Sequence, residues 1–166
     1  AKCLLDNNWA AIEKDLNARP VENVTGNSSH TQIEEILKKY GILAHEVQLW
    51  GTGKPLREFL WSEEMADACV FVMEQVNFDD LKGTHKEVRN CHINIGTGKE
   101  ISIHNLAMLI KERVGYKGTI TFDATKPDGT MRKLTDVSKL NALGWKHTVE
   151  VDEGVERLYK WYKFSD

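Results

Sequence analysis

Residues 46–61 read EVQLWGTGKPLREFLW, and this stretch gives the clearest indication of fold class in the chain. Glu46 to Trp50 alternates polar and apolar residues, and Arg57 to Trp61 is a short apolar run; both patterns are typical of β-strands. Gly51 to Pro55 contains the glycines and the proline that a turn between two strands requires. We therefore expect two short strands joined by a tight, glycine-rich connection.

Helices are expected on both sides of this stretch. Ser62 is placed to cap a helix that runs to about Val76, because two glutamates follow it in the first turn. Ser102 is placed to cap another, which ends at Gly115 in a left-handed conformation. The other expected elements are helices at 2–19, 31–40, 137–143 and 151–163, strands at 92–95 and 119–122, and an exposed loop at 79–89. Strands and helices alternate, which indicates an α/β fold.

Composition excludes several classes of protein. The 166 residues are 41% hydrophobic, enough for one domain with a core. The net charge is -3, which gives no electrostatic attraction to nucleic acid or to an anionic membrane surface. No apolar run approaches the roughly 20 residues of a membrane span. Three cysteines, Cys3, Cys69 and Cys91, form neither a disulfide framework nor a zinc motif, so we expect a reducing, cytoplasmic location.

Common catalytic and cofactor motifs are absent from the sequence. No Gly-x-Gly-x-x-Gly follows an expected strand, so the chain shows no dinucleotide site of its own. The six histidines have no ligand-like spacing, and we expect no metal site. The sequence does not exclude a catalytic Ser-His-Asp triad, because the members of a triad come together from distant positions in a chain.

The tripeptide Gly-Thr-Gly followed by lysine occurs twice, at 51–54 and at 96–99. Neither copy is a P-loop, because the first glycine and the final hydroxyl of that motif are missing. Each copy follows an expected strand. We therefore expect that each loop is able to bring backbone N–H groups close to a phosphate.

The segment from Lys126 to Lys133 is the richest in polar residues and has two interpretations. Composition alone favours a solvated surface loop. The alternative is that Lys133 or Arg132 binds a diphosphate and Asp128 binds sugar hydroxyls, with Arg57 as a second cation. Trp50 likewise offers a flat face to a sugar or base, although a tryptophan at a strand end is more often part of a core.

Four stretches together resemble the GDP-L-fucose synthases, which are extended short-chain dehydrogenase/reductases. They are VQLWGTGKPLREFL (47–60), EMADA (64–68), HINIGTG (92–98) and FDATKPDGTMRK (122–133). The last is the most specific, since the shorter pieces occur throughout the superfamily. The resemblance covers 46–166 and implies a substrate-binding domain there, whereas 1–45 resembles the end of a preceding helix followed by a helical insertion.

The resemblance implies a mixed α/β C-terminal substrate domain whose Rossmann half is absent from this chain. Such enzymes convert GDP-4-keto-6-deoxy-D-mannose to GDP-L-fucose by epimerisation at C3 and C5 and reduction of C4 with NADPH. The catalytic groups and the NADP(H) site would lie in that N-terminal half, so the isolated chain is expected to be inactive. When intact, the enzyme is expected to be a homodimer.

The resemblance carries four substrate contacts to this chain: Trp50, Arg57, Asp128 and Lys133, with Arg57 and Lys133 at the diphosphate. No catalytic residue is carried over, and the three cysteines stay structural. Two alternatives remain. One is another sugar-nucleotide epimerase or dehydratase of the same superfamily, and the other is a noncatalytic nucleotide-sugar-binding module.

Overall fold

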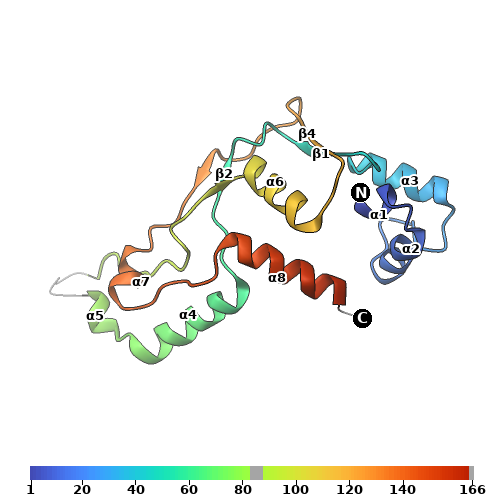
Figure 1. The fold of residues 1–166 in the computed structure, drawn as a ribbon. Helices are drawn as coiled ribbons and strands as arrows, with labels where there is room; N and C mark the ends of the chain where they lie inside the picture. The colour runs from blue at the N-terminus through green and yellow to red at the C-terminus, as the bar shows by residue number, and fades with distance from the viewer. Residues whose placement is uncertain (83–87, 165–166) are drawn as a thin grey trace. The chain divides into compact units, whose positions relative to one another are not determined.

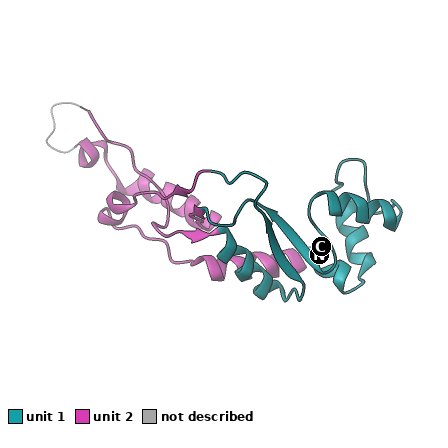
Figure 2. Ribbon diagram, turned by 90° about the horizontal axis from the view of Figure 1, so that it is seen from above, with its two compact units in different colours: residues 1–55, 103–129 teal, residues 56–102, 130–166 magenta. Residues whose placement is uncertain are grey.

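A computed structural model describes residues 1–82 and 88–164 of the chain (Figure 1). The chain forms two compact units, which are described separately (Figure 2). Unit 1 comprises Ala1–Pro55 and Ile103–Gly129, and unit 2 comprises Leu56–Ser102 and Thr130–Asp166. The expected mixed α/β architecture is confirmed, because each unit contains both helices and a small sheet. The division of 1–45 from the rest of the chain stays a prediction.

Unit 1 begins with three helices, α1 (Lys2–Leu5), α2 (Trp9–Ala18) and α3 (His30–Lys39). The single helix expected over 2–19 is interrupted, because Asn7 adopts a positive φ of 52° and Asn8 caps α2 by accepting the N–H of Ala11. The cap of α3 is Ser29, so this helix begins one residue earlier than the expected start at residue 31. Gln32 explains the difference, since its side chain completes a capping box with Ser29.

The first three helices bury a small apolar set consisting of Leu16, Ile33 and Ile36. Helix α2 and the start of α3 also meet through polar groups. The rings of Trp9 and His30 stack with centroids 3.7 Å apart, and His30 Nε2 lies 3.0 Å from Glu13 Oε1. These contacts hold α2 against the start of α3.

The sheet of unit 1 consists of β1 (Glu46–Trp50) and β4 (Thr119–Asp123), which run parallel from the pair Glu46↔Thr119 to the pair Trp50↔Asp123. Helix α6 (Ile103–Val114) precedes β4. It ends as expected at Gly115, whose φ is 70°. The buried Tyr116 then donates its hydroxyl to Ala44 O, 3.0 Å away, just before β1.

Unit 2 contains a three-stranded sheet in the order β3-β2-β5, formed by β2 (Leu56–Arg57), β3 (Ile101–Ser102) and β5 (Arg132–Lys133). Strand β2 is antiparallel to β3 and parallel to β5. The strand expected over 57–61 is therefore wrong beyond Arg57. The chain leaves the ladder at Glu58, whose side chain instead accepts hydrogen bonds from neighbouring loops.

The strand expected at 92–95 is also wrong, because these residues form no ladder. Side-chain hydrogen bonds connect this segment to 136–139 in place of a ladder. Asn94 donates its side-chain amide to Asp136 O at 3.0 Å, and Lys139 Nζ donates to His92 O at 2.9 Å. An apolar run of this length becomes a strand only where another strand is available to pair with it.

The helices of unit 2 are α4 (Ser62–Gln75), α5 (Phe78–Lys82), α7 (Ser138–Ala142) and α8 (Val151–Phe164). Ser62 is the first residue of α4 and not its cap; the cap position is Trp61, with no side-chain hydrogen bond. The loop expected at 79–89 is wrong over the residues of α5, and 83–87 lie outside the described residues. Of the helices in the described ranges, none is both long and apolar enough to cross a bilayer.

The core of unit 2 lies around Ala68, Leu140 and Trp145. Ala68 and Leu140 have no exposed surface, and Leu60, Phe71, Val72, Ile93 and Ile95 pack against this cluster. The indole N–H of Trp145 is satisfied by Asp67 Oδ2 at 2.7 Å. This core joins α4 to α7, which directly follows β5 and the segment 134–137.

Candidate functional site

Trp50 ends β1, and its side chain is 73% exposed. Trp50 is therefore not part of a core in the described structure, which was the alternative interpretation of this residue. The ammonium of Lys126 lies 5.6 Å from the centroid of its ring, within the range of a cation–π interaction. Trp50 thus presents an aromatic surface with a cation beside it, both in unit 1.

Asp128 closes the first Gly-Thr-Gly loop. Its Oδ1 accepts the N–H of Thr52 at 2.8 Å, and its Oδ2 accepts the Thr52 hydroxyl at 2.6 Å. Gly51 has a φ of 82°, and a Cβ at this position would overlap Oδ1 of Asp128. The Thr52 hydroxyl and N–H hold the pKa of Asp128 below its usual value, so the group is a carboxylate at neutral pH.

Glu58 closes the second Gly-Thr-Gly loop in the same way. Its Oε1 accepts the N–H groups of Thr97 and Gly98, both at 2.6 Å, and its Oε2 accepts the N–H of Thr135 at 3.1 Å. A Cβ on Gly96 would lie 2.6 Å from Oε1. Burial raises the pKa of Glu58, but hydrogen bonds from Thr135, Gly98 and Thr97 outweigh it and lower the pKa overall.

The two loops are therefore built in the same way. In each, a carboxylate from elsewhere in the chain accepts hydrogen bonds from backbone N–H groups of the loop. In both, the threonine hydroxyl also accepts the N–H of the following lysine, Lys54 or Lys99. The prediction that the loops present these groups to a phosphate is wrong for the N–H groups of Thr52, Thr97 and Gly98. The sequence pattern did not reveal this, because neither carboxylate lies in the loop that it fills.

Arg57 and Lys133 are brought together by the sheet of unit 2, where they are partners in the parallel register of β2 and β5. Arg57 Nη1 donates to Leu56 O at 2.6 Å and to Thr130 O at 2.7 Å. Lys133 is exposed. Within residues 1–82 and 88–164, neither cation forms an ion pair with a carboxylate. Two cations on neighbouring strands thus keep their charges available for an anion.

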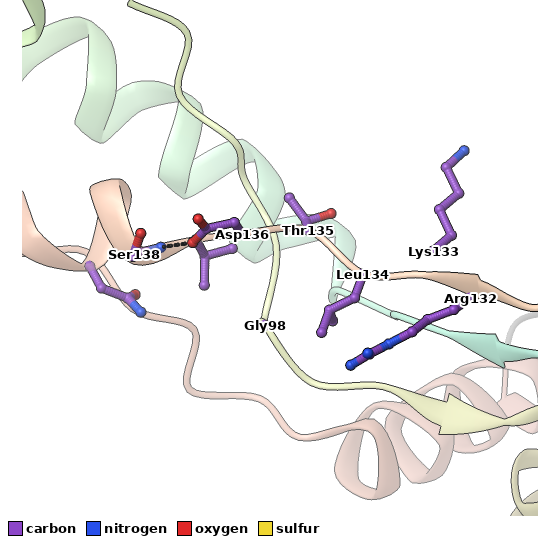
Figure 3. Close-up of a pocket in the computed structure, with 9 residues that line it drawn as sticks. Gly98, Arg132, Lys133, Leu134, Thr135, Asp136 and Ser138 are labelled. Atoms are coloured by element: carbon purple, nitrogen blue, oxygen red, sulfur yellow. Dashed lines mark hydrogen bonds between the residues drawn. The ribbon is translucent and has the colours of Figure 1, made fainter. Parts of the chain in front are cut away.

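Arg132 differs from Lys133 although the two are adjacent. Figure 3 shows their side chains leaving β5 on opposite sides, as alternation along a strand requires. Arg132 Nε lies 2.9 Å from Oε1 of Glu100, whose side chain is only 17% exposed. Of the two cations proposed for a diphosphate at this position, Lys133 is therefore the one without a carboxylate partner in the described structure.

Two pockets border these cations. One, of about 740 Å³, is lined by both Arg132 and Lys133 and by residues that include Thr135, Ser138 and Asn141 (Figure 3). The other, of about 240 Å³, is lined by residues that include Arg57, Phe59 and Glu100. Arg57 and Lys133 are thus paired through the sheet but contribute to different cavities of unit 2.

The four predicted substrate contacts are divided between the two units, with Trp50 and Asp128 in unit 1 and Arg57 and Lys133 in unit 2. Among the described residues, no group of His, Cys, Asp and Glu is arranged to hold a metal ion. The glycine loops do not fit a dinucleotide pyrophosphate either, because Asp128 and Glu58 fill them. The chemistry that this arrangement supports is the binding of an anionic ligand by fixed cations.

Comparison with known proteins finds similarity to an epimerase/dehydratase family and to GDP-L-fucose synthases. Residues 19–96 match the model of the NAD dependent epimerase/dehydratase family. The chain is 48% identical to GDP-L-fucose synthase 1 of Arabidopsis thaliana over 119 residues, which are 72% of this chain and 33% of that protein. It is 41% identical to the GDP-L-fucose synthase of Escherichia coli over 147 residues, 86% of this chain and 45% of that protein.

A solved structure has a similar fold. The GDP-D-glycero-L-gluco-heptose synthase of Campylobacter jejuni, solved in the presence of NADPH, superimposes with a TM-score of 0.83 at 36% identity. The alignment covers 98% of this chain and 43% of that one. The resemblance expected from the sequence is confirmed. The chain spans between a third and less than half of the length of these relatives.

Proposed function

We propose that this chain is the GDP-sugar-binding part of a GDP-L-fucose synthase, an NADPH-dependent enzyme that converts GDP-4-keto-6-deoxy-D-mannose to GDP-L-fucose. Identities of 41% and 48% to GDP-L-fucose synthases support the assignment. Because the chain spans less than half of these relatives, the reaction is proposed for the longer enzyme. The isolated chain is proposed to bind the nucleotide sugar without converting it.

The pairing of Arg57 with Lys133 is the observation that carries this proposal. A diphosphate needs positive charge on more than one side, and adjacent strands place two cations about 4.8 Å apart at their backbones. Arg57 is held by two carbonyl groups, so its remaining N–H groups are oriented before a ligand arrives. Lys133 supplies a flexible second charge. The assignment of Trp50 and Asp128 to the same ligand stays a prediction from the resemblance.

The cofactor and the catalytic groups are proposed to come from an N-terminal Rossmann half that this chain does not contain. NADP(H) would supply the hydride for reduction at C4. The role left to the present residues is to bind the diphosphate and to orient the sugar. The intact enzyme is proposed to be a cytoplasmic homodimer.

A second candidate is a related enzyme that acts on a GDP-heptose. The structural similarity to the Campylobacter jejuni heptose synthase favours it. Both candidates share the GDP moiety, so the diphosphate contacts argued above apply to either. They differ in the sugar that the enzyme accepts.

Calorimetric titration of the chain with GDP-L-fucose tests the proposal, with GDP-mannose and UDP-galactose as controls. We expect both GDP-sugars to bind, GDP-L-fucose more tightly, and UDP-galactose to bind at least tenfold more weakly, a difference of about 1.4 kcal/mol. Equal binding of UDP-galactose contradicts a GDP-sugar site. Absence of any binding contradicts the proposal that this chain by itself forms the nucleotide-sugar site.

A further inference from the structure

Glu58 connects three segments of unit 2 through one carboxylate. It lies directly after Arg57 in the chain, its Oε1 accepts the N–H groups of Thr97 and Gly98, and its Oε2 accepts the N–H of Thr135. Thr135 follows Lys133 by two residues. The carboxylate thus joins the backbone next to Arg57 to the backbone next to Lys133.

The sheet alone gives this pair little rigidity. Strands β2 and β5 are two residues long, and isolated pairing of this length is weak. Glu58 extends the connection beyond the ladder, because its hydrogen bond to Thr135 continues on the C-terminal side of the Arg57↔Lys133 pair. Without it, the segment after Lys133 would have one fewer link to the strand that carries Arg57.

Gly96 makes room for this arrangement. A side chain at that position would meet Oε1 of Glu58 at 2.6 Å, closer than real Cβ atoms come to an oxygen. The carboxylate of Glu58 is also hydrogen-bonded within the protein, since its oxygens accept three backbone N–H groups. Glu58 is therefore suited to hold the backbone and not to contact an anion.

We propose that Glu58 is a positioning residue, which sets the spacing of Arg57 and Lys133 and thereby the affinity of the chain for the diphosphate of a GDP-sugar. This inference rests on the proposed function of those two cations. Because imposing the spacing before binding avoids an ordering cost, loss of Glu58 weakens diphosphate binding although Glu58 does not touch the ligand.

The test uses Glu58→Gln in the 166-residue chain. Glutamine keeps the size of the side chain but replaces one acceptor oxygen with an NH₂ group, which cannot accept an N–H. Glu64→Gln is the matched control. Glu64 also lies in unit 2 and accepts the N–H groups of Thr148 at 2.5 Å and Val149 at 3.0 Å. Within the described residues its hydrogen bonds do not join the backbone next to Arg57 to the backbone next to Lys133, although Val149 lines the same pocket as Arg57.

The measurements are the calorimetric affinity for GDP and the thermal midpoint of each variant. We expect both variants to lower the midpoint, but only Glu58→Gln to weaken GDP binding, by about tenfold. A double-mutant cycle of Glu58→Gln and Lys133→Ala separates a positioning role from general destabilisation, because it measures whether the two losses in GDP affinity depend on each other. If Glu58 acts through Lys133, then Lys133→Ala costs less affinity in the Glu58→Gln background than in the wild type.

The outcomes separate the two proposals. If Lys133→Ala weakens GDP binding while Glu58→Gln binds like the wild type, the positioning role is wrong and the diphosphate site stands. The same conclusion follows if the two losses are additive. If Lys133→Ala leaves GDP binding unchanged, the proposed function of the cation pair is itself wrong, and the positioning role fails with it.

Discussion

Replacement of Lys133 with alanine should weaken GDP binding much more than replacement of its neighbour Arg132. Lys133 is exposed and has no carboxylate partner among the described residues, so its full charge is available to a phosphate. A charge-assisted hydrogen bond of this kind contributes about 1 to 3 kcal/mol after solvent screening, which corresponds to roughly 5- to 150-fold in affinity. Arg132 is paired with Glu100 on the other side of the strand.

Calorimetry of the two alanine variants with GDP, at low and high ionic strength, measures the difference. We expect Arg132→Ala to bind within about twofold of the wild type, since surface ion pairs contribute little. We expect Lys133→Ala also to reduce the salt dependence of the affinity, because one screened charge has been removed. Equal losses for both variants would mean that total positive charge, and not the placement of Lys133, governs binding.

Three further predictions concern the core, the carboxylates and the aromatic surface. Leu140→Ala should lower the free energy of unfolding by about 2 to 5 kcal/mol in denaturant titrations, because Leu140 is fully buried; a loss below 1 kcal/mol would contradict the packing. Hydrogen bonds from Thr148 and Val149 outweigh burial and lower the pKa of Glu64 from 4.5, so its contribution to stability should be complete above about pH 4.5 and lost as the pH falls through the lowered value. Acid unfolding of Glu64→Gln should therefore depend less steeply on pH than that of the wild type. Trp50→Ala should weaken GDP-L-fucose binding by about 0.5 to 1.5 kcal/mol with little change in stability, since the ring is exposed; unchanged calorimetric affinity would remove Trp50 from the site.

Local sequence patterns predicted the elements that depend on nearby residues. Strand β1 and helix α6 with its glycine end follow from alternation, apolar periodicity and a positive φ, which are properties of consecutive residues. The expected strand at 92–95 failed for the opposite reason. Whether an apolar run forms a ladder depends on a partner strand, and here the segment is connected by side-chain hydrogen bonds instead, from Lys139 to His92 O and from Asn94 to Asp136 O.

The candidate site divides in the same way. The stretches 47–60 and 122–133 contain Trp50, Arg57, Asp128 and Lys133. They were enough to identify the resemblance, because a motif is recognised from consecutive residues without a structure. Composition alone did not distinguish Lys133 from Arg132, since both are cations in one polar segment, and the choice of Lys133 came from the resemblance. Strand alternation and the position of Glu100, 32 residues before Arg132, made that distinction.

The alternation of helices and strands, the glycine turns and the resemblance to GDP-L-fucose synthases could all be predicted from the amino-acid sequence, because each depends on residues that are close together in the chain. The groups that fill the glycine loops became apparent from the folded structure. Asp128 reaches a loop 76 residues away and Glu58 one 39 residues away. Hydrogen bonds across such separations depend on how the chain folds back on itself, and no pattern in a short segment specifies them.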